Sequence, residues 1–461
     1  MTISFLSTRG QSPALDFRAA TLAGLAQDGG LYVPQSWPQF TAADIKALQG
    51  KPYAEIAYAV LNPFIEPHIP GDVLRDLIRK SYAGFADPAI APLKQLDDRH
   101  WVLELFHGPT LAFKDIALQL LGHIFEYFLA QKNERMTVIG ATSGDTGSAA
   151  IAALAGRKNI DVFILYPNKG PSDIQRKQMT CVDVPNVHAL GIEGSFDDCQ
   201  AIVKALFNDA PLRAKYNFAA VNSINILRIL AQIVYYVAVA AHFAPKPISF
   251  VVPTGNFGNV YAGYAAHKCG APISKLAVAN NRNDILTRFF NSGAMKPAPV
   301  QSSLSPSMDI QISSNFERLL FDLCGGDSAA VRGYMQGKGE FTVSQVQLAK
   351  ARQIFTAARA DDELTLQTIR EIYEQHKYIL DPHSAVAVAA AKQLARELPE
   401  PVVMLATAHP AKFPETIEKA IGVRPALPAA VADLLKRPER TVRLAADARS
   451  VQDYVAGAIK I

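Results

Sequence analysis

The chain has 461 residues, of which 49% are hydrophobic and 19% charged, a composition typical of a globular protein with two or three domains. Its 46 basic and 42 acidic residues leave a net charge of only +4, and no block of like charge dominates, which argues against nucleic acid as the main partner. The most apolar stretch, residues 224–243, contains Asn225, Arg228, Gln232 and His242, so it is predicted to be a buried helix and not a membrane span.

The cysteines indicate a reducing compartment. Cys181, Cys199, Cys269 and Cys324 are widely scattered, without a Cys-x-x-Cys pair. The first residues also lack the basic region and apolar core of an export signal. We therefore expect a cytoplasmic protein with reduced cysteines and without a membrane partner.

Residues 1–90 are expected to form a mostly helical N-terminal unit. Thr41 and Asp44 have the spacing of a capping box, and further helices are expected near residues 53–61 and 72–82. Residues 91–130 then begin a large domain. The apolar run 101–106 predicts a strand that ends at a Gly-Pro turn, and Lys114 lies where the next helix starts.

Short apolar runs alternate with helical segments in the rest of the chain. Strands expected at 137–140, 161–165 and 187–190 define a small domain over residues 131–244. Strands expected at 248–252, 275–279 and 402–406 place the second part of the large domain at residues 245–425, with an inserted, mostly helical region at about 290–380. Residues 426–461 are expected to be a C-terminal helical tail. The predicted fold class is α/β, with two parallel-rich, three-layer α/β/α domains.

Two strand-to-helix loops are rich in hydrogen-bond donors. The loop Gly255-Asn-Phe-Gly-Asn259 offers converging backbone N–H groups at a helix N-terminus, where a phosphate is well held, although a plain turn explains this loop equally well. The loop Ala141-Thr-Ser-Gly-Asp-Thr-Gly147 offers N–H and O–H donors to a carboxylate, or its Ser143 or Asp145 caps the following helix.

Lys114 is the candidate catalytic residue that would act together with these two loops. Partial burial and the positive end of a helix both favour the neutral amine, which can form a Schiff base with a carbonyl. A solvated lysine in a first helical turn is the alternative.

Several segments resemble one enzyme family. The segment His107-Gly-Pro-Thr-Leu-Ala-Phe-Lys-Asp115 is similar to the cofactor-lysine segment of threonine synthases, pyridoxal-phosphate enzymes of fold type II with the tryptophan-synthase-β architecture. Residues 141–147, 255–259 and 406–410 resemble the same family in the expected order, and residues 7–10 and 24–34 resemble its amino terminus. The resemblance implies pyridoxal 5'-phosphate as the cofactor. It also implies conversion of O-phospho-L-homoserine and water to L-threonine and phosphate, the last step of threonine biosynthesis.

The resemblance further implies roles for individual residues. Lys114 would bind the cofactor and act as the catalytic acid and base. The cofactor-binding residues would be Lys114, Phe113, Gly255, Asn256, Phe257, Gly258, Asn259 and Thr407, with the 255–259 loop on the phosphate and Thr407 on the pyridine nitrogen. The substrate would contact Thr142, Ser143, Asp145 and Thr146. Many relatives of this architecture carry asparagine at position 145, beside the phenolic oxygen of the cofactor, so Asp145 would face elsewhere or share a proton. No metal is expected.

Some alternatives stay open. Two groups of residues are candidates to hold the substrate phosphate: residues 168–172 with Arg176 and Lys177, or residues 307–310 and 314–318. The nearest rival activity is that of a threonine or serine dehydratase of the same architecture, and a catalytically silent binding protein is the rival from another class. The chain is expected to act as a monomer or a homodimer on a small-molecule substrate.

Overall fold

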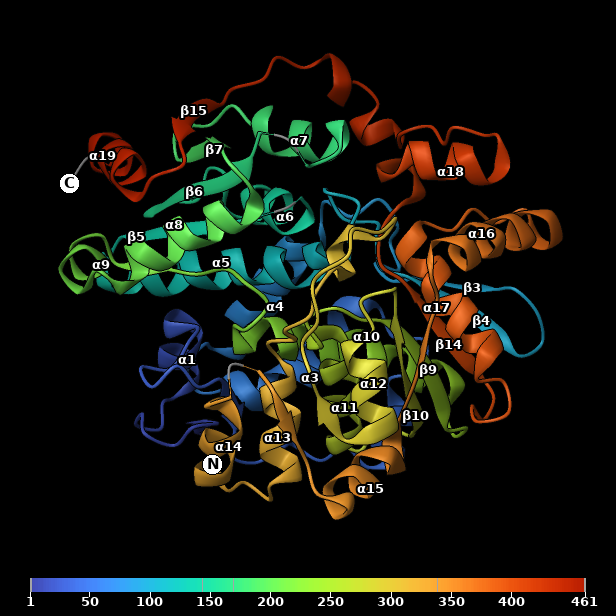
Figure 1. The fold of residues 1–461 in the computed structure, drawn as a ribbon. Helices are drawn as coiled ribbons and strands as arrows, with labels where there is room; N and C mark the ends of the chain where they lie inside the picture. Colours follow the sequence, from blue (N-terminus) through green and yellow to red (C-terminus); the bar gives the residue numbers. More distant parts are fainter. Residues whose placement is uncertain (1, 143, 169, 338, 460–461) are drawn as a thin grey trace.

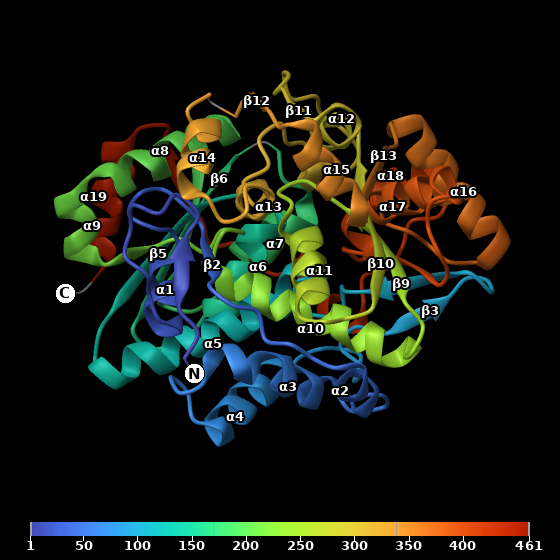
Figure 2. The ribbon, with the colours of Figure 1, turned by 90° about the horizontal axis from the view of Figure 1, so that it is seen from below.

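The computed structural model describes residues 2–142, 144–168, 170–337 and 339–459. Two α/β units lie side by side, and a mostly helical N-terminal unit packs against both of them, with its helices along the lower edge of Figure 2 (Figures 1 and 2). The predicted fold class is confirmed by the two separate sheets, which are parallel except for one edge strand.

The N-terminal unit joins a small antiparallel sheet to four helices. Strands β1 (Phe5–Ser7) and β2 (Tyr32–Pro34) pair with each other. The helices are α1 (Phe17–Ala23), α2 (Ala42–Ala47), α3 (Tyr53–Ile65) and α4 (Gly71–Tyr82). The predicted capping box is confirmed, because the Thr41 hydroxyl accepts from the Asp44 N–H while the Asp44 carboxylate accepts from the Thr41 N–H.

The larger sheet has six strands in the order β13-β10-β9-β14-β4-β3. These are β13 (Phe355–Arg359), β10 (Ile273–Asn280), β9 (Ile248–Pro253), β14 (Val402–Ala406), β4 (His100–Glu104) and β3 (Leu93–Gln95). Only β3 runs antiparallel to its neighbour. Val251 of β9 packs with helix α17 (Pro382–Gln393), whereas Phe250 and Val252 pack with α10 (Ile226–Phe243) and α11 (Gly258–Lys268). Both faces of the sheet are therefore covered, as its continuous apolar strands predict.

The smaller sheet has five parallel strands in the order β15-β7-β6-β5-β8. These are β15 (Val442–Ala445), β7 (Val187–Glu193), β6 (Ile160–Pro167), β5 (Met136–Ala141) and β8 (Phe218–Ala219). Helix α6 (Asp145–Leu154), with α5 (Lys114–Lys132) behind it, covers one face, and α8 (Phe196–Asn208) with α19 (Ala448–Ala458) covers the other.

The remaining elements are mostly short. They are α7 (Asp173–Thr180), α9 (Ala210–Tyr216), α12 (Ile285–Ser292), β11 (Ala294–Met295), η1 (Pro306–Met308), α13 (Phe316–Leu323), α14 (Ser328–Met335), β12 (Phe341–Thr342), α15 (Gln345–Ile354), α16 (Asp362–His376), η2 (Pro410–Lys412), α18 (Pro414–Ile421), η3 (Ala429–Val431) and η4 (Leu434–Lys436). The region 290–380 is mostly helical, but it also supplies β13 as an edge strand of the larger sheet.

The last segment of the chain crosses between the two units. From α18 it runs over the top of the molecule to β15, which pairs with β7 (Figure 1). The expected helical tail therefore contains a strand of the smaller sheet. The domain boundaries given above stay a prediction.

Helix α10 is the one described helix that is long and apolar enough to cross a membrane. In the structure, 83% of its apolar window is buried against the rest of the protein. That burial fits the predicted core helix.

Candidate active site

Lys114 is the first residue of α5, at the end of a loop that leaves β4. The loop is fastened to the segment that follows β14, because the Phe113 N–H donates to the Thr407 carbonyl at 2.9 Å and the His409 N–H donates to the Leu111 carbonyl at 3.0 Å. Leu111 has a φ of 61°, in the left-handed region that residues other than glycine rarely adopt. Such left-handed backbone costs energy in a leucine, so the surrounding structure must hold it in place.

Strand order gathers the expected cofactor residues at one edge of the larger sheet. β9, β14 and β4 are consecutive parallel neighbours. Their carboxyl ends lead to Gly255–Asn259, to Thr407 and to the Lys114 loop respectively. Adjacent strands are about 4.8 Å apart, so the three segments begin within roughly 10 Å of one another. Ligands bind α/β sheets at this edge.

The 255–259 turn has the features of an anion cradle. α11 starts at Gly258, so its first N–H groups are free to face a ligand. The Asn259 Oδ1 accepts from the hydroxyls of Tyr235 at 2.5 Å and Tyr236 at 3.0 Å, which fixes the amide orientation. Its buried Nδ2 has no hydrogen-bond partner among the described residues. A buried donor left over in this way points to a missing acceptor.

Neighbouring segments hold this turn in place. A Cβ at Gly255 would lie 3.0 Å from the Ser307 carbonyl and 3.1 Å from Ile310, so the backbone approaches that segment closely. The Ser313 hydroxyl donates to the Gly255 carbonyl at 2.7 Å. Phe257 has a φ of 63°, and its ring is buried among other aromatic rings, so it can serve a ligand only through its backbone.

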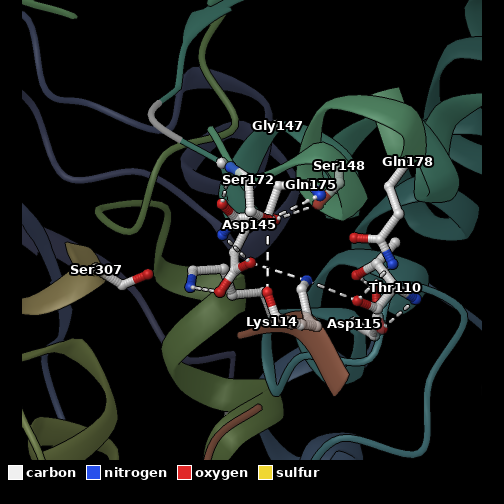
Figure 3. A network of polar contacts seen from close by, with 12 residues as sticks. Thr110, Lys114, Asp115, Asp145, Gly147, Ser148, Ser172, Gln175, Gln178 and Ser307 are labelled. Atoms are coloured by element: carbon white, nitrogen blue, oxygen red, sulfur yellow. Dashed lines mark hydrogen bonds and ion pairs between the residues drawn. The ribbon is translucent and has the colours of Figure 1, made fainter. Parts of the chain in front are cut away.

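A cluster of buried charges surrounds the Lys114 amine (Figure 3). Asp145, the first residue of α6, places Oδ2 3.5 Å from the Lys114 Nζ and Oδ1 2.8 Å from the Lys412 Nζ. The Gln175 side chain, from α7, donates to the same Oδ1 at 2.8 Å. The Lys412 side chain is fully buried, and that of Lys114 is 11% exposed. The cluster thus joins residues of both α/β units.

The charges in this cluster act on one another. Burial lowers the pKa of Lys114, the nearby cations Lys412 and Arg228 lower it further, and Asp145 opposes them. Although burial alone would raise the pKa of Asp145, Lys412 and Lys114 hold it well below its usual range. Asp145 is therefore ionised, and it is paired with two lysines. The structure thus shows Asp145 beside two lysines, and its position relative to the phenolic oxygen of the cofactor stays a prediction.

Asp115 stabilises the loop from the helix side. Its two carboxylate oxygens accept from the Thr110 N–H at 2.8 Å and from the Thr110 hydroxyl at 2.7 Å. The Thr110 carbonyl in turn accepts from the Lys412 Nζ at 2.7 Å and from Gln178 at 3.0 Å. Burial raises the pKa of Asp115 to about 6. This network fixes the backbone immediately before Lys114.

The expected substrate loop follows β5 and faces the same cluster. The Thr142 hydroxyl accepts from the N–H groups of Gly144 at 3.0 Å and Gly147 at 2.9 Å, so its described contacts shape the loop itself. Thr146 is half-buried at the start of α6. Ser143 lies outside the described residues. Among the described residues, no side chain caps α6, because the Asp145 carboxylate contacts the lysines instead.

Thr407 is reached by a chain of buried polar groups. Its N–H donates to the Ser384 Oγ at 3.2 Å, and the Ser384 hydroxyl donates to Asp381, the N-cap of α17. His383 contacts Asp381 at 2.8 Å. Thr407 is 6% exposed, and both its backbone groups are engaged. Its backbone thus lies beside Phe113, and the contact of its hydroxyl with the pyridine nitrogen stays a prediction.

Several cations considered for the substrate phosphate have other partners, and Lys169 lies outside the described residues. Arg176 pairs with Glu439 and Asp173, and Lys177 donates to the Arg437 carbonyl at 2.7 Å. Arg318 is fully buried, and its guanidinium donates to the carbonyls of Tyr32 and Ile224 and to the side chain of Asn315.

Sequence reasoning missed two buried cations at the site. Lys412 belongs to an apolar Pro-Ala-Lys-Phe-Pro segment just past Thr407. A lysine among apolar residues could have indicated a buried charge there. Arg228 interrupts the apolar sequence of α10, where it is 2% exposed. One of its nitrogens donates to the Val221 carbonyl, and its Nε has no partner among the described residues.

These features fit pyridoxal phosphate. The buried amine suits its aldehyde, and the free Asn259 donor at a helix N-terminus suits its phosphate. The sequence model of the family described as "Pyridoxal-phosphate dependent enzyme" matches residues 88–408. The chain is a pyridoxal-phosphate-dependent enzyme of fold type II.

Further comparisons identify the family within this class. Models described as "Threonine synthase N terminus" and "Threonine synthase, C-terminal" match residues 4–82 and 384–455. A threonine synthase of Pseudomonas aeruginosa is 49% identical over 98% of both chains. A crystal structure of threonine synthase from Brucella melitensis with bound pyridoxal phosphate covers 100% of both chains at 50% identity, with a TM-score of 0.97. The yeast enzyme structure has a TM-score of 0.93 at 40% identity, covering 99% of this chain and 98% of that one. The chain belongs to the threonine synthase family.

Proposed function

We propose that the Lys114 cluster and the adjacent 255–259 turn form the active site for conversion of O-phospho-L-homoserine and water to L-threonine and phosphate. The observation that supports this most directly is the meeting of a buried amine and an anion cradle at the carboxyl ends of neighbouring strands. Family membership supports the choice of reaction.

Three segments would hold the cofactor. Lys114 would bind its aldehyde carbon, and Phe113 would lie beside it. The residues Gly255, Asn256, Phe257, Gly258 and Asn259 would hold its phosphate through backbone N–H groups and the Asn259 amide. Thr407 would meet its ring nitrogen with a neutral hydroxyl. When bound, the cofactor supplies an electron sink for negative charge formed at the substrate.

Lys114 would then move protons. An amine whose pKa is lowered by burial and by Lys412 and Arg228 is neutral more often at neutral pH, so it can accept a proton from the substrate Cα and return one at another carbon. Removal of protons at Cα and Cβ allows phosphate to leave from Cγ, and water then adds at Cβ. The Lys114 amine would serve both proton transfers.

The loop 141–147 would orient the substrate. The N–H groups at the start of α6 are suited to a carboxylate, with Thr142 shaping the turn and Thr146 and Ser143 as further expected contacts. Arg228, a buried cation with an unused Nε among the described residues, supports a second anion site near Lys114. We infer that this cation attracts the substrate phosphate.

A small molecule is the substrate of such an enzyme. The cytoplasmic location, the monomer or homodimer, and the lack of nucleic-acid or membrane partners stay predictions.

Phosphate release distinguishes this function from its nearest rival. Purified protein with pyridoxal phosphate should release phosphate and form threonine from O-phospho-L-homoserine, and it should not form a keto acid from threonine at a comparable rate. Lys114→Ala should abolish turnover, because both the cofactor bond and the proton transfers need this amine. Phosphate release by Lys114→Ala at the wild-type rate would refute the assignment.

A further inference from the structure

Lys412 lies at the centre of the charge cluster, although it contacts neither the anion cradle nor the 141–147 backbone in the described hydrogen bonds. Its ammonium group is completely buried and bridges the Asp145 Oδ1 at 2.8 Å and the Thr110 carbonyl at 2.7 Å. A buried lysine carries a large desolvation cost, so packing alone does not explain the presence of Lys412 at this position.

The charges around the Lys114 amine come from four elements. Asp145 faces it from α6, Lys412 from η2 and Arg228 from α10, while Asp115 follows it on α5. Asp115 directs both carboxylate oxygens to Thr110. Asp145 is thus the described carboxylate that pairs with the amine, at 3.5 Å. Left alone with Lys114, it would hold a proton on the amine, since an opposite charge favours the charged form.

We propose that Lys412 is a positioning residue that neutralises Asp145 and so leaves the Lys114 amine free to lose its proton. This inference rests on the proposed function, in which Lys114 acts as a neutral amine. Many relatives of this architecture carry an uncharged asparagine at position 145. In this chain, Asp145 paired with Lys412 would likewise place no net charge beside the Lys114 amine.

Distances and partners support the assignment. The Asp145 carboxylate lies closer to Lys412 than to Lys114, 2.8 Å against 3.5 Å, and Gln175 further engages the oxygen that Lys412 contacts. Lys412 is held toward Asp145 by the Thr110 carbonyl. Its charge also lowers the pKa of Lys114 directly. The alternative is that the Lys412–Asp145 ion pair only joins the two α/β units. That role would need the same contacts, but loss of Lys412 would then leave the protonation of Lys114 unchanged.

The test measures protonation of Lys114 in the apoprotein. Acetic anhydride modifies only the neutral amine, and peptide mass spectrometry gives the rate at residue 114 as a function of pH. Lys412→Met should raise the midpoint of this titration by about one to two pH units, so labelling slows about 10- to 100-fold at a fixed lower pH. Asp145→Asn should lower the midpoint. The double variant, which lacks both charges, should return it close to the wild-type value.

Controls separate charge from structure. Lys392→Met removes a lysine from an exposed ion pair with Glu371 and should leave the midpoint unchanged. If Lys412→Met does not fold, Asp145→Asn is compared with the double variant, which must have the higher midpoint. The double variant removes a buried pair together and leaves no isolated charge.

Equal Lys114 midpoints in the folded variants would overturn the inference. Because the titration uses apoprotein, it does not depend on cofactor binding. Failure of the proposed function would instead appear as cofactor attached to another residue of the wild-type protein.

Discussion

The Asn259 amide allows a specific test of the phosphate cradle. Its Oδ1 is fixed by the hydroxyls of Tyr235 and Tyr236, and its buried Nδ2 has no partner among the described residues. Asn259→Leu keeps a side chain of similar size and removes the donor. Both tyrosines keep another acceptor, since Tyr235 also donates to Gln232 and Tyr236 also donates to the Asn259 backbone carbonyl. The apoprotein should therefore remain folded.

The expected magnitude follows from the charge of the ligand. A hydrogen bond to a charged group contributes about 1.5–3 kcal/mol. Its loss should weaken pyridoxal-phosphate binding by about 10- to 150-fold. Tyr235→Phe is a matched control, because it removes a group that orients the amide but keeps the donor. The loss there should stay below about 10-fold.

Comparing two ligands, with and without the phosphate, isolates the contribution of the Asn259 contact with the phosphate. Apoprotein is titrated with pyridoxal phosphate and with pyridoxal, which lacks the phosphate, and the visible absorbance is followed. Asn259→Leu should weaken the first ligand and leave the second nearly unchanged. Equal losses for both ligands, or no loss for either, would refute the placement of the phosphate on this turn.

Two further substitutions test the neighbourhood of Lys114. Thr407→Val should weaken cofactor binding or shift its visible absorbance, because it removes the hydroxyl expected at the ring nitrogen; identical spectra and kinetics would reject that placement. Burial and the neighbouring His107 lower the pKa of His409 to about 4, so the stability tied to its neutral form is present above its ordinary pKa of 6.5 and is lost as the pH falls toward 4. His409→Asn retains a cap for the Ala411 N–H and should reduce the loss of unfolding free energy between pH 7 and pH 5 by about 2 kcal/mol. Urea unfolding at the two pH values measures this, and an unchanged difference would contradict it.

The sequence predicted the elements that carry strong local signals. The apolar run of β9, buried on both faces, and the capping box at Thr41 depend on neighbouring residues, so they could be recognised without tertiary information. A further capping box, formed by Ser195 and Asp198 at the start of α8, has the same local origin.

Edge strands were harder to predict. β13 follows directly after α15, and its Phe-Thr-Ala-Ala-Arg sequence contains alanines that favour helix as much as strand. Its strand form depends on pairing with β10. The four residues of β15 likewise depend on β7, about 250 positions earlier in the chain. Such pairings are fixed by tertiary contacts and not by local propensity.

The site shows the same division. Lys114 and the two glycine-rich loops follow strands and open helices, so their positions could be inferred from the order of elements. Lys412 is not part of a periodic sequence pattern. Its burial is explained by its ion pair with Asp145, which belongs to the other α/β unit. Pairs of this kind cannot be read from one chain segment.

The most direct test of the central claim is to locate the cofactor bond. Wild-type protein saturated with pyridoxal phosphate is reduced with borohydride, digested and analysed by peptide mass spectrometry. The account predicts one pyridoxyl group, on Lys114. Modification of another lysine such as Lys412, with Lys114 left unmodified, would contradict it.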